Sequence, residues 1–267
     1  MTGRSVVSTD QAVRTKAGER RAVLVWQIAF GLGALALWEL TGRVFGSTWT
    51  SLPSQIAQRL LLWGGTDLFR HVYVTLTEVF VGLALGTVAG VVAGLALGRT
   101  QTLALVLRPI IVTLYSVPLV TMAPLLILWF GLEMESKIVL VTVVVFFLMF
   151  FNTFAGVQSI DPLLVTTLDL MGATTLERYR KVIAPAAMAW IFSGIKIALP
   201  YALSAATTGE LLGGSYGLGT LLSRAGSQFD MTGLYTALIV LLVIGILLSE
   251  GVAFVENHLL RWRHVAE

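Results

Sequence analysis

Two long apolar runs of this chain are separated by residues 161–185, DPLLVTTLDLMGATTLERYRKVIAP, a polar and basic stretch. Asp161 can cap the start of a helix with its side chain. Gly172 stands where a helix ends on a residue that tolerates positive φ. Thr174 and Glu177 then have the spacing of a capping box, which starts a second helix. The stretch therefore predicts two short helices joined at a glycine, here called the elbow, which we expect to contact a partner.

The composition of the chain is that of a membrane protein. Hydrophobic residues make up 56% of it and charged residues only 12%, whereas soluble domains carry about a quarter charged residues. Apolar stretches long enough to cross a bilayer as helices recur along the chain. We predict an all-α membrane protein without a soluble domain, with six transmembrane helices at about 22–42, 71–98, 103–131, 137–158, 186–212 and 232–256.

Lys and Arg residues are distributed unevenly over the predicted loops. With the N-terminus in the cytoplasm, twelve fall on the inner side, five on the outer side and Lys196 within a span. Because cytoplasmic loops carry the excess of basic residues, both termini and the elbow are predicted to be cytoplasmic. The net charge of +3 follows from this asymmetry and indicates no nucleic-acid partner. The inner residues are Arg4, Arg14, Lys16, Arg20, Arg21, Arg99, Arg108, Arg178, Arg180, Lys181, Arg261 and Arg263, and the outer ones are Arg43, Arg59, Arg70, Lys137 and Arg224.

The second predicted span carries a glycine at every fourth position, at Gly82, Gly86, Gly90, Gly94 and Gly98. Small residues at this spacing let two helix backbones approach closely in lipid. We predict that this face of the span packs against another helix. The pattern indicates a helix bundle and says nothing about a cargo.

Prolines lie inside two of the predicted spans, Pro109, Pro118 and Pro124 in the third and Pro200 in the fifth. A proline inside a helix frees a backbone carbonyl and kinks the helix. Membrane proteins tolerate such breaks within protein or beside a water-filled path, and broken helices are common in transport pathways. We place Pro118, Pro124 and Pro200 at a candidate translocation path, although kinking for packing explains each of them equally well.

Ionisable residues are few in the predicted spans, and the candidates among them are Glu39, Glu78, Lys196, Glu210 and Glu250. A charge near the bilayer centre is costly, so each is a candidate functional residue. Glu39 and Glu78 lie near outer span ends and Glu250 near an inner end, where they can reach water. Lys196 lies midway along the fifth span, where it can line the path or extend to the interface.

Glu210 precedes a glycine-rich loop at the outer end of the fifth span. Gly213 and Gly214 allow close backbone approach and unusual dihedrals there. We predict that Glu210 and the turn after it line or gate the outer mouth of the path. The alternative is a structural or solvated role for this carboxylate.

Several enzyme and metal signatures are absent or out of place. Residues 213–217 match the G-x-S-x-G pattern, which requires a strand–turn–helix context and a base, but they follow a membrane helix. No Walker-type G-x-x-x-x-G-K-[ST] sequence occurs, so the chain does not bind ATP in that way. The absence of cysteine excludes disulfides and thiolate metal sites. We expect no catalytic residue, no metal site and no cofactor in this chain.

The elbow resembles the cytoplasmic signature loop of bacterial ABC importer permeases. In that loop Glu-Ala-Ala is followed after three residues by Gly and, nine residues later, by Ile-x-Leu-Pro. Gly172 and Pro185 keep this spacing, with Val182 for Ile and Ala184 for Leu. Residues 166–168, Thr-Thr-Leu, stand where Glu-Ala-Ala is expected.

Further segments are similar to the nitrate/sulfonate/taurine group of these permeases, so that the resemblance covers roughly residues 30–260. The sequence departs from the group at Thr166, where the loop glutamate is missing and its acidic contact is lost or moved to Asp169. Glu78 and Lys196 stand where the group often carries arginine. The similar segments are 52–54, 117–118, 124–131, 136–138, 152–161 and 209–219.

The resemblance implies the type I importer permease fold in the bacterial plasma (inner) membrane. Two copies would pair as a homodimer on two cytoplasmic ABC ATPase subunits, which bind ATP and Mg. A periplasmic or lipid-anchored binding protein would deliver the cargo, a small oxyanion such as a sulfonate, taurine or nitrate, although relatives also carry vitamin precursors and aromatic acids. The elbow would be the coupling helix, with contact residues Leu164, Thr166, Thr167, Leu168, Asp169, Met171, Gly172 and Ala173.

The expected organisation is a disordered cytoplasmic tail at residues 1–21, a transmembrane permease domain at 22–260 and a cytoplasmic tail at 261–267. The alternative function is a secondary transporter or channel without an ATPase partner. It would require an inverted repeat or mid-membrane carboxylates for a coupling ion. The sequence shows no convincing repeat, and its acidic residues lie towards span ends.

Overall fold

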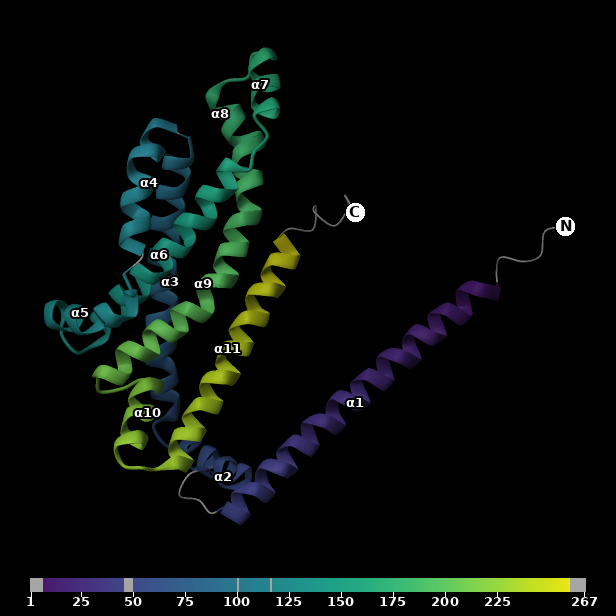
Figure 1. Cartoon of the computed structure of the whole chain (residues 1–267), viewed down its shortest axis with the longest axis vertical. Helices are drawn as coiled ribbons and strands as arrows, with labels where there is room; N and C mark the ends of the chain where they lie inside the picture. The colour runs from purple at the N-terminus through teal and green to yellow at the C-terminus, as the bar shows by residue number, and fades with distance from the viewer. Residues whose placement is uncertain (1–6, 46–49, 100, 116, 260–267) are drawn as a thin grey trace.

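The chain folds into helices joined by short loops (Figure 1). The computed structural model describes residues 7–45, 50–99, 101–115 and 117–259, and these residues contain no strand, in agreement with the predicted all-α fold. The elements are α1 (Val7–Phe45), α2 (Pro53–Gly64), α3 (Leu68–Arg99), α4 (Gln101–Tyr115), the 3-10 helix η1 (Leu119–Met122), α5 (Ala123–Phe130), α6 (Met134–Gln158), α7 (Pro162–Leu170), α8 (Thr175–Arg178), the π-helix η2 (Tyr179–Ile183), α9 (Ala184–Leu212), α10 (Leu218–Ser227) and α11 (Met231–Leu259).

Four helical segments of the described chain are long and apolar enough to cross a membrane. They are Leu68–Gly98, Met134–Gln158, Leu176–Leu212 and Met231–His258, and they match the second, fourth, fifth and sixth predicted spans. The first predicted span lies within α1, and the third is divided among α4, η1 and α5. Four of the six predicted spans are thus long apolar helices among the described residues.

The break in the third predicted span lies at one of its three prolines. Pro109 lies inside α4, which continues to Tyr115. The helix ends before Pro118, since the residue before a proline is disfavoured in the α conformation. Pro124 lies in the first turn of α5, where its missing N–H is not needed. Pro200 lies inside α9, which runs without interruption from Ala184 to Leu212.

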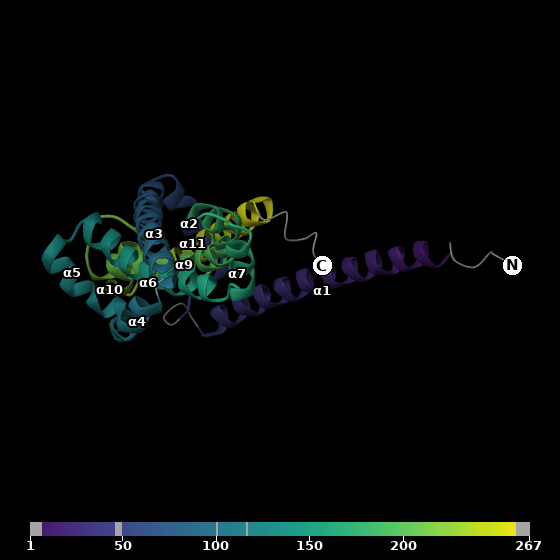
Figure 2. The same ribbon diagram turned by 90° about the horizontal axis from the view of Figure 1, so that it is seen from above.

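The helix α1 begins at Val7, so residues 7–21, predicted as a disordered tail, are helical in the structure. They contain no proline, and they extend an existing apolar helix, which requires no new nucleation. The two outermost tail segments, 1–6 and 261–267, lie outside the described residues. Along most of its length α1 stands apart from the other helices and approaches them near α2 (Figures 1 and 2).

The glycine ladder of α3 lies against α6, and this is the most extensive helix–helix contact of the molecule. A Cβ atom added at any of the five glycines from Gly82 to Gly98 would come within 2.5–2.8 Å of an atom of α6. No side chain fits at such distances, so the two backbones approach closely along five helical turns. This packing fixes α3 and α6 as one unit.

A second close contact joins α6 to α9. A Cβ at Gly156 would come within 2.7 Å of Trp190, and one at Gly209 within 2.8 Å of the Lys137 side chain. The buried α9 residues between these points, such as Ala202, are largely alanines, and small residues permit this approach. The elbow helices α7 and α8 lie at one end of the resulting bundle, and α2 and α10 lie at the other (Figure 1).

Candidate functional site

The elbow contains the two short helices that the sequence predicts. Asp161 Oδ1 accepts a hydrogen bond of 2.8 Å from the Leu163 N–H at the start of α7. Gly172 has φ +76°, and the following N–H, of Ala173, donates to the Leu168 carbonyl oxygen at 3.0 Å, the closing bond of a Schellman motif. The capping box follows, since the Thr174 N–H donates to Glu177 Oε2 at 2.9 Å. Local hydrogen bonds thus define both helices and the turn between them.

Large apolar side chains project from the elbow. Leu164 and Met171 are 55% and 77% exposed, whereas Leu168, the third residue of the predicted apolar face, is half-buried. The structure adds Leu170, 85% exposed, and Leu176, which the predicted face did not include. A cluster of exposed apolar residues of this kind marks a surface that contacts protein or membrane.

The polar side of the elbow is described in part. Thr166 and Thr167 are exposed, and the Thr167 hydroxyl donates to the Leu163 carbonyl oxygen within α7 at 2.8 Å. The Asp169 side chain, to which the missing loop glutamate's contact was assigned, lies outside the described atoms. Lys181 pairs with Glu177 at 3.2 Å at the start of the long helical segment that leads into α9.

A buried hydrogen-bond network occupies the opposite end of the bundle, around Glu210. Thr75 donates its hydroxyl to Glu210 Oε1 at 2.6 Å, and the Gly219 N–H donates to Oε2 at 2.6 Å. The Leu218 N–H donates to the Thr75 hydroxyl oxygen at 2.9 Å. Two backbone amides of the start of α10 are thereby tied to α3 and α9.

His71 extends this network along α3. The Gly217 N–H donates to His71 Nδ1 at 2.9 Å, so Nδ1 is the unprotonated ring nitrogen in that bond. The Gly217 carbonyl oxygen lies 2.8 Å from the same nitrogen, and a single nitrogen forms only one of the two bonds at a time. The ring also lies 5.4 Å from the ring of Tyr216, between centroids.

Glycines make room for the Glu210 carboxyl group. Gly217 has φ +129°, and a Cβ there or at Gly219 would overlap Glu210. Gly214 has φ +142°, and a Cβ there would come within 3.1 Å of Lys137 Nζ, while one at Gly213 would come within 2.5 Å of Leu132. The loop 213–219 therefore lies directly on the side chains beneath it.

Glu210 and the turn after it are predicted to line or gate the outer mouth, and the structure places the Glu210 side chain below that turn. Glu210 is 1% exposed and lies beneath the loop rather than on a surface. The physical reason is that Thr75 and Gly219 supply hydrogen bonds to both carboxylate oxygens, which makes burial of the group tolerable. Within the loop, Ser215 is the exposed residue and donates to Glu133 Oε1 at 3.2 Å.

Glu78 and Lys137 are also buried at this end of the bundle, although Glu78 was expected to reach water and Lys137 was counted only as an outer loop charge. They are 1% and 2% exposed. The Lys137 ammonium group donates to the carbonyl oxygens of Leu132 and Glu133. His71, Thr75 and Glu78 continue the α3 glycine face outwards at helical spacing, and this periodicity was a signal that could have identified them.

The other path residues do not join this network. Lys196 forms an ion pair with Glu256 of α11. Pro118 and Pro124 lie between α4 and the first turn of α5. Pro200 lines a separate cavity. The structure therefore brings together Glu210, Gly213 and Gly214 but not the remaining predicted path residues.

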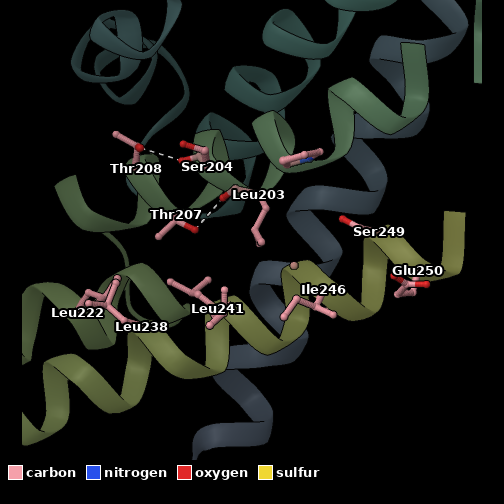
Figure 3. Close-up of a pocket in the computed structure, with 13 residues that line it drawn as sticks. Leu203, Ser204, Thr207, Thr208, Leu222, Leu238, Leu241, Ile246, Ser249 and Glu250 are labelled. Atoms are coloured by element: carbon pink, nitrogen blue, oxygen red, sulfur yellow. Dashed lines mark hydrogen bonds between the residues drawn. The ribbon is translucent and has the colours of Figure 1, made fainter. Parts of the chain in front are cut away.

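The cavity beside Pro200 lies between α9, α10 and α11 and has a volume of about 610 Å³ (Figure 3). The Thr207 and Thr208 hydroxyls donate to carbonyl oxygens one turn back in α9, at 2.7 and 2.8 Å. Glu250 is the one ionisable residue among those that line it, and most of the rest are aliphatic. No group of three or more His, Asp or Glu residues in the described chain could hold a metal ion.

Comparison with known proteins agrees with this architecture. The family described as binding-protein-dependent transport system inner membrane component matches residues 86–261. The formylaminopyrimidine transport permease protein ThiX of Halalkalibacterium halodurans is 31% identical over 236 residues, covering 88% of this chain and 94% of that protein. The putative aliphatic sulfonates transport permease protein SsuC of Bacillus subtilis is 31% identical over 263 residues, covering 96% and 94%.

A solved structure supplies the fold comparison. An inward-facing conformation of the MetNI methionine ABC transporter aligns with a TM-score of 0.63 at 24% identity, covering 75% of this chain and 96% of the solved chain. This likeness shows the fold. The resemblance noted from the elbow and its flanking segments is confirmed: the chain belongs to the family of binding-protein-dependent transport system inner membrane components, the permeases of ABC transporters.

Proposed function

We propose that this chain is the permease subunit of an ATP-driven importer, which forms the substrate path and couples it to cytoplasmic ATPase subunits through the elbow. The observation that carries the proposal is the exposed apolar surface of the elbow at the end of the bundle, around Leu164, Leu170 and Met171. ATP and Mg are bound by the partner subunits, and this chain catalyses no reaction.

Docking of the elbow into an ATPase cleft removes its exposed apolar area from water. Such burial contributes about 25 cal/mol per Å² of apolar surface. Gly172 sets the angle between α7 and the chain that leads into α9, because its φ of +76° is rarely adopted by other residues. The contact residues are those of the coupling-helix prediction: Leu164, Thr166, Thr167, Leu168, Asp169, Met171, Gly172 and Ala173.

The helices α6 and α9 carry motion from the elbow to the opposite end of the bundle. Both flank the elbow directly, and both are fixed to each other by close packing at Gly156 and Gly209. At the ends of α6 and α9 that lie away from the elbow, Lys137 and Glu210 are buried beneath the loop 213–219. Closure of the ATPase pair thus shifts a two-state bundle between inward-facing and outward-facing forms.

The full assembly contains two copies of this chain, two ATPase subunits and a periplasmic or lipid-anchored binding protein. It lies in the bacterial inner membrane with both termini cytoplasmic. The support for this orientation is the basic residue asymmetry. Reporter fusions within 161–185 are expected to report the cytoplasm and fusions within 46–66 the outside.

The cargo is assigned only as a class of small polar compounds. Small oxyanions of the sulfonate, taurine or nitrate type are the first to test, and the two relatives named above bear a sulfonate and a pyrimidine in their names. No basic residue is among those lining the cavity beside Pro200, so that cavity offers no cation to an oxyanion. Selectivity is therefore assigned to the binding protein.

The proposal predicts genes for an ATPase and a binding protein beside the gene of this chain, and it is tested by co-expressing their products with it. The ATPase should co-purify, and proteoliposomes should take up the ligand of the binding protein only when ATP is supplied. Uptake that proceeds without ATP and follows an ion gradient would instead establish the alternative, a secondary transporter.

A further inference from the structure

A second cavity, of about 310 Å³, lies beside the loop 213–219 at the end of the bundle away from the elbow. This volume is at the lower end of the range for small-molecule sites. Its walls come from α3, from the start of α6 and from the loop. The cavity beside Pro200 is lined mostly by aliphatic side chains. The lining of the second cavity includes two basic and two acidic residues, Arg70, Lys137, Glu78 and Glu133.

These four charged residues lie at different depths. Glu78 and Lys137 are 1% and 2% exposed and form the inner wall, whereas Arg70 and Glu133 are exposed and lie at the mouth. Arg70 and Glu78 lie two turns apart on one face of α3, about 12 Å along the helix axis. The cavity therefore leads from a basic and an acidic residue at the surface to a buried residue of each kind.

The carboxyl group of Glu78 is the incomplete part of the inner wall. Its Oε2 atom is buried and has no hydrogen-bond partner among the described residues. Lys137 does not supply one, because its ammonium group donates to the carbonyl oxygens of Leu132 and Glu133. A buried oxygen without a donor is unfavourable whether the carboxyl group is ionised or neutral. The terminal torsion of glutamate is soft, so a donor in the cavity can complete this group.

The Arg70 guanidinium group offers the opposite charge near the mouth. Its Cζ atom lies 3.6 Å from the centroid of the Tyr216 ring, and such a contact with the face of an aromatic ring is attractive. A guanidinium group carries five N–H donors in its own plane, so the contact with the ring leaves donors for an anion. The oxygens of a carboxylate or sulfonate group match donors of this kind.

The two ends of this cavity together select a class of ligand. A simple anion bound at Arg70 leaves Glu78 Oε2 without a donor, and a simple cation bound at Glu78 leaves the Arg70 guanidinium group without an acceptor. A molecule with both an ammonium group and an anionic group satisfies both residues. The lining contains equal numbers of basic and acidic residues, so a ligand without net charge also leaves its charge balance unchanged.

We propose that this cavity binds a small zwitterion, whose ammonium group donates to Glu78 and whose carboxylate or sulfonate group accepts from Arg70. The site itself is independent of the proposed function, whereas its use during transport rests on that function. In that role the permease favours, among the oxyanions considered above, those that also carry an amino group. It thereby adds a second selection to that of the binding protein.

Binding is measured by isothermal titration calorimetry on the purified full chain in detergent, without the ATPase or the binding protein. Taurine and β-alanine are the zwitterionic probes, with a sulfonate and a carboxylate group, and ethanesulfonate and ethylammonium each lack one of the two charged groups. At least one zwitterion should bind about tenfold or more tightly than either singly charged probe, the effect of one charge-assisted hydrogen bond. Absence of binding by both zwitterions, or equal binding of a singly charged probe, would overturn the proposal.

Three variants locate the site. Glu78→Leu removes the buried acceptor and should weaken binding of the zwitterion about tenfold or more. Arg70→Gln, at an exposed position where folding is little affected, should weaken the zwitterion to the affinity of ethylammonium and leave ethylammonium itself unchanged. Glu135→Leu is the matched control, because Glu135 is exposed on α6 and does not line the cavity. Parent affinity for the zwitterion in Arg70→Gln, or in Glu78→Leu, would overturn the assigned contacts.

Calorimetry and transport separate the site from the proposed function. The parent chain is reconstituted with the ATPase and the binding protein, and ATP-dependent uptake is measured in proteoliposomes. Zwitterion binding that depends on Glu78 and Arg70, without ATP-dependent uptake, would support the site and refute the proposed function. ATP-dependent uptake by a chain that binds neither zwitterion would overturn the site and leave the proposed function standing.

Discussion

The two ends of this bundle are built in opposite ways. At the elbow, capping bonds are local and the large side chains Leu170 and Met171 face outwards. At the other end, residues from three helices and a loop meet in a network in which Glu78 and Glu210 are buried. A surface for a partner is thus formed by short-range sequence, whereas a buried polar network needs the assembled bundle.

The close packing between α3 and α6 joins the two ends, and breaking it should have the largest effect. In Gly90→Ala the new Cβ would meet Phe146 O and Met149 at 2.7 Å, which strains both backbones. We expect about 1–3 kcal/mol of destabilisation, as overpacking typically produces, measured as a lower thermal unfolding temperature in detergent. Uptake should fall as well.

Gly251→Ala on α11 is the matched control for this substitution, because nothing lies within 4 Å of its added Cβ. Alanine favours a helix over glycine by about 1 kcal/mol, so this variant should unfold at the parent temperature or above it. If Gly90→Ala unfolded in the same way as Gly251→Ala, the α3–α6 contact would be looser than described.

Positive-φ glycines occur at both ends and offer the next comparison. In Gly172→Ala no atom lies within 4 Å of the added Cβ. The only expected loss of stability is that of a non-glycine residue in the left-handed conformation, about 1–2 kcal/mol. Gly217→Ala has a larger backbone penalty, because φ 129° and ψ 158° lie in a region that is essentially open to glycine alone, and its Cβ also overlaps the Glu210 carboxyl group. Gly217→Ala should therefore lower the unfolding temperature further than Gly172→Ala does. The reverse order would contradict the placement of Glu210 beneath the loop.

The ion pair between Lys196 and Glu256 belongs to neither end of the bundle. Its removal should have the smallest effect on transport. The Lys196 side chain is 43% exposed, and exposed pairs contribute about 0–1 kcal/mol. Lys196→Met should transport its cargo at nearly the parent rate, with Glu256→Gln as its partner variant. Loss of uptake in Lys196→Met with the unfolding temperature unchanged would return Lys196 to the translocation path.

The sequence predicts the elbow better than the buried hydrogen-bond network around Glu210, and the reason is physical. Asp161, Gly172 and the Thr174–Glu177 box act within a few residues, so their spacing alone specifies the turns that the structure contains. The α3 ladder is likewise a periodic pattern, but nothing in it names α6 as the partner. The contact of Thr75 with Glu210 spans 135 positions, and no spacing rule reaches so far.

Apolar length alone does not distinguish one membrane helix from several shorter ones. The predicted third span divides before Pro118, because a proline limits both its own backbone and that of the preceding residue. Residues 7–21 show the opposite case, since polar residues there continue an apolar helix instead of forming a tail. In both cases the residues that precede or follow in the sequence, rather than local polarity, decide the conformation.

The central claim, coupling through the elbow, is tested most directly by ATPase co-purification combined with transport in proteoliposomes. Leu168→Asp and Gly172→Val are the variants to measure, with Leu164→Asp, at a position that is 55% exposed, as the third. All three variants should insert in the membrane and retain the hydrogen-bond network around Glu210. They should bind the ATPase weakly, or the assembled complex should hydrolyse ATP without uptake. Normal ATPase binding and normal transport in all three would contradict the assignment of the elbow as the coupling element.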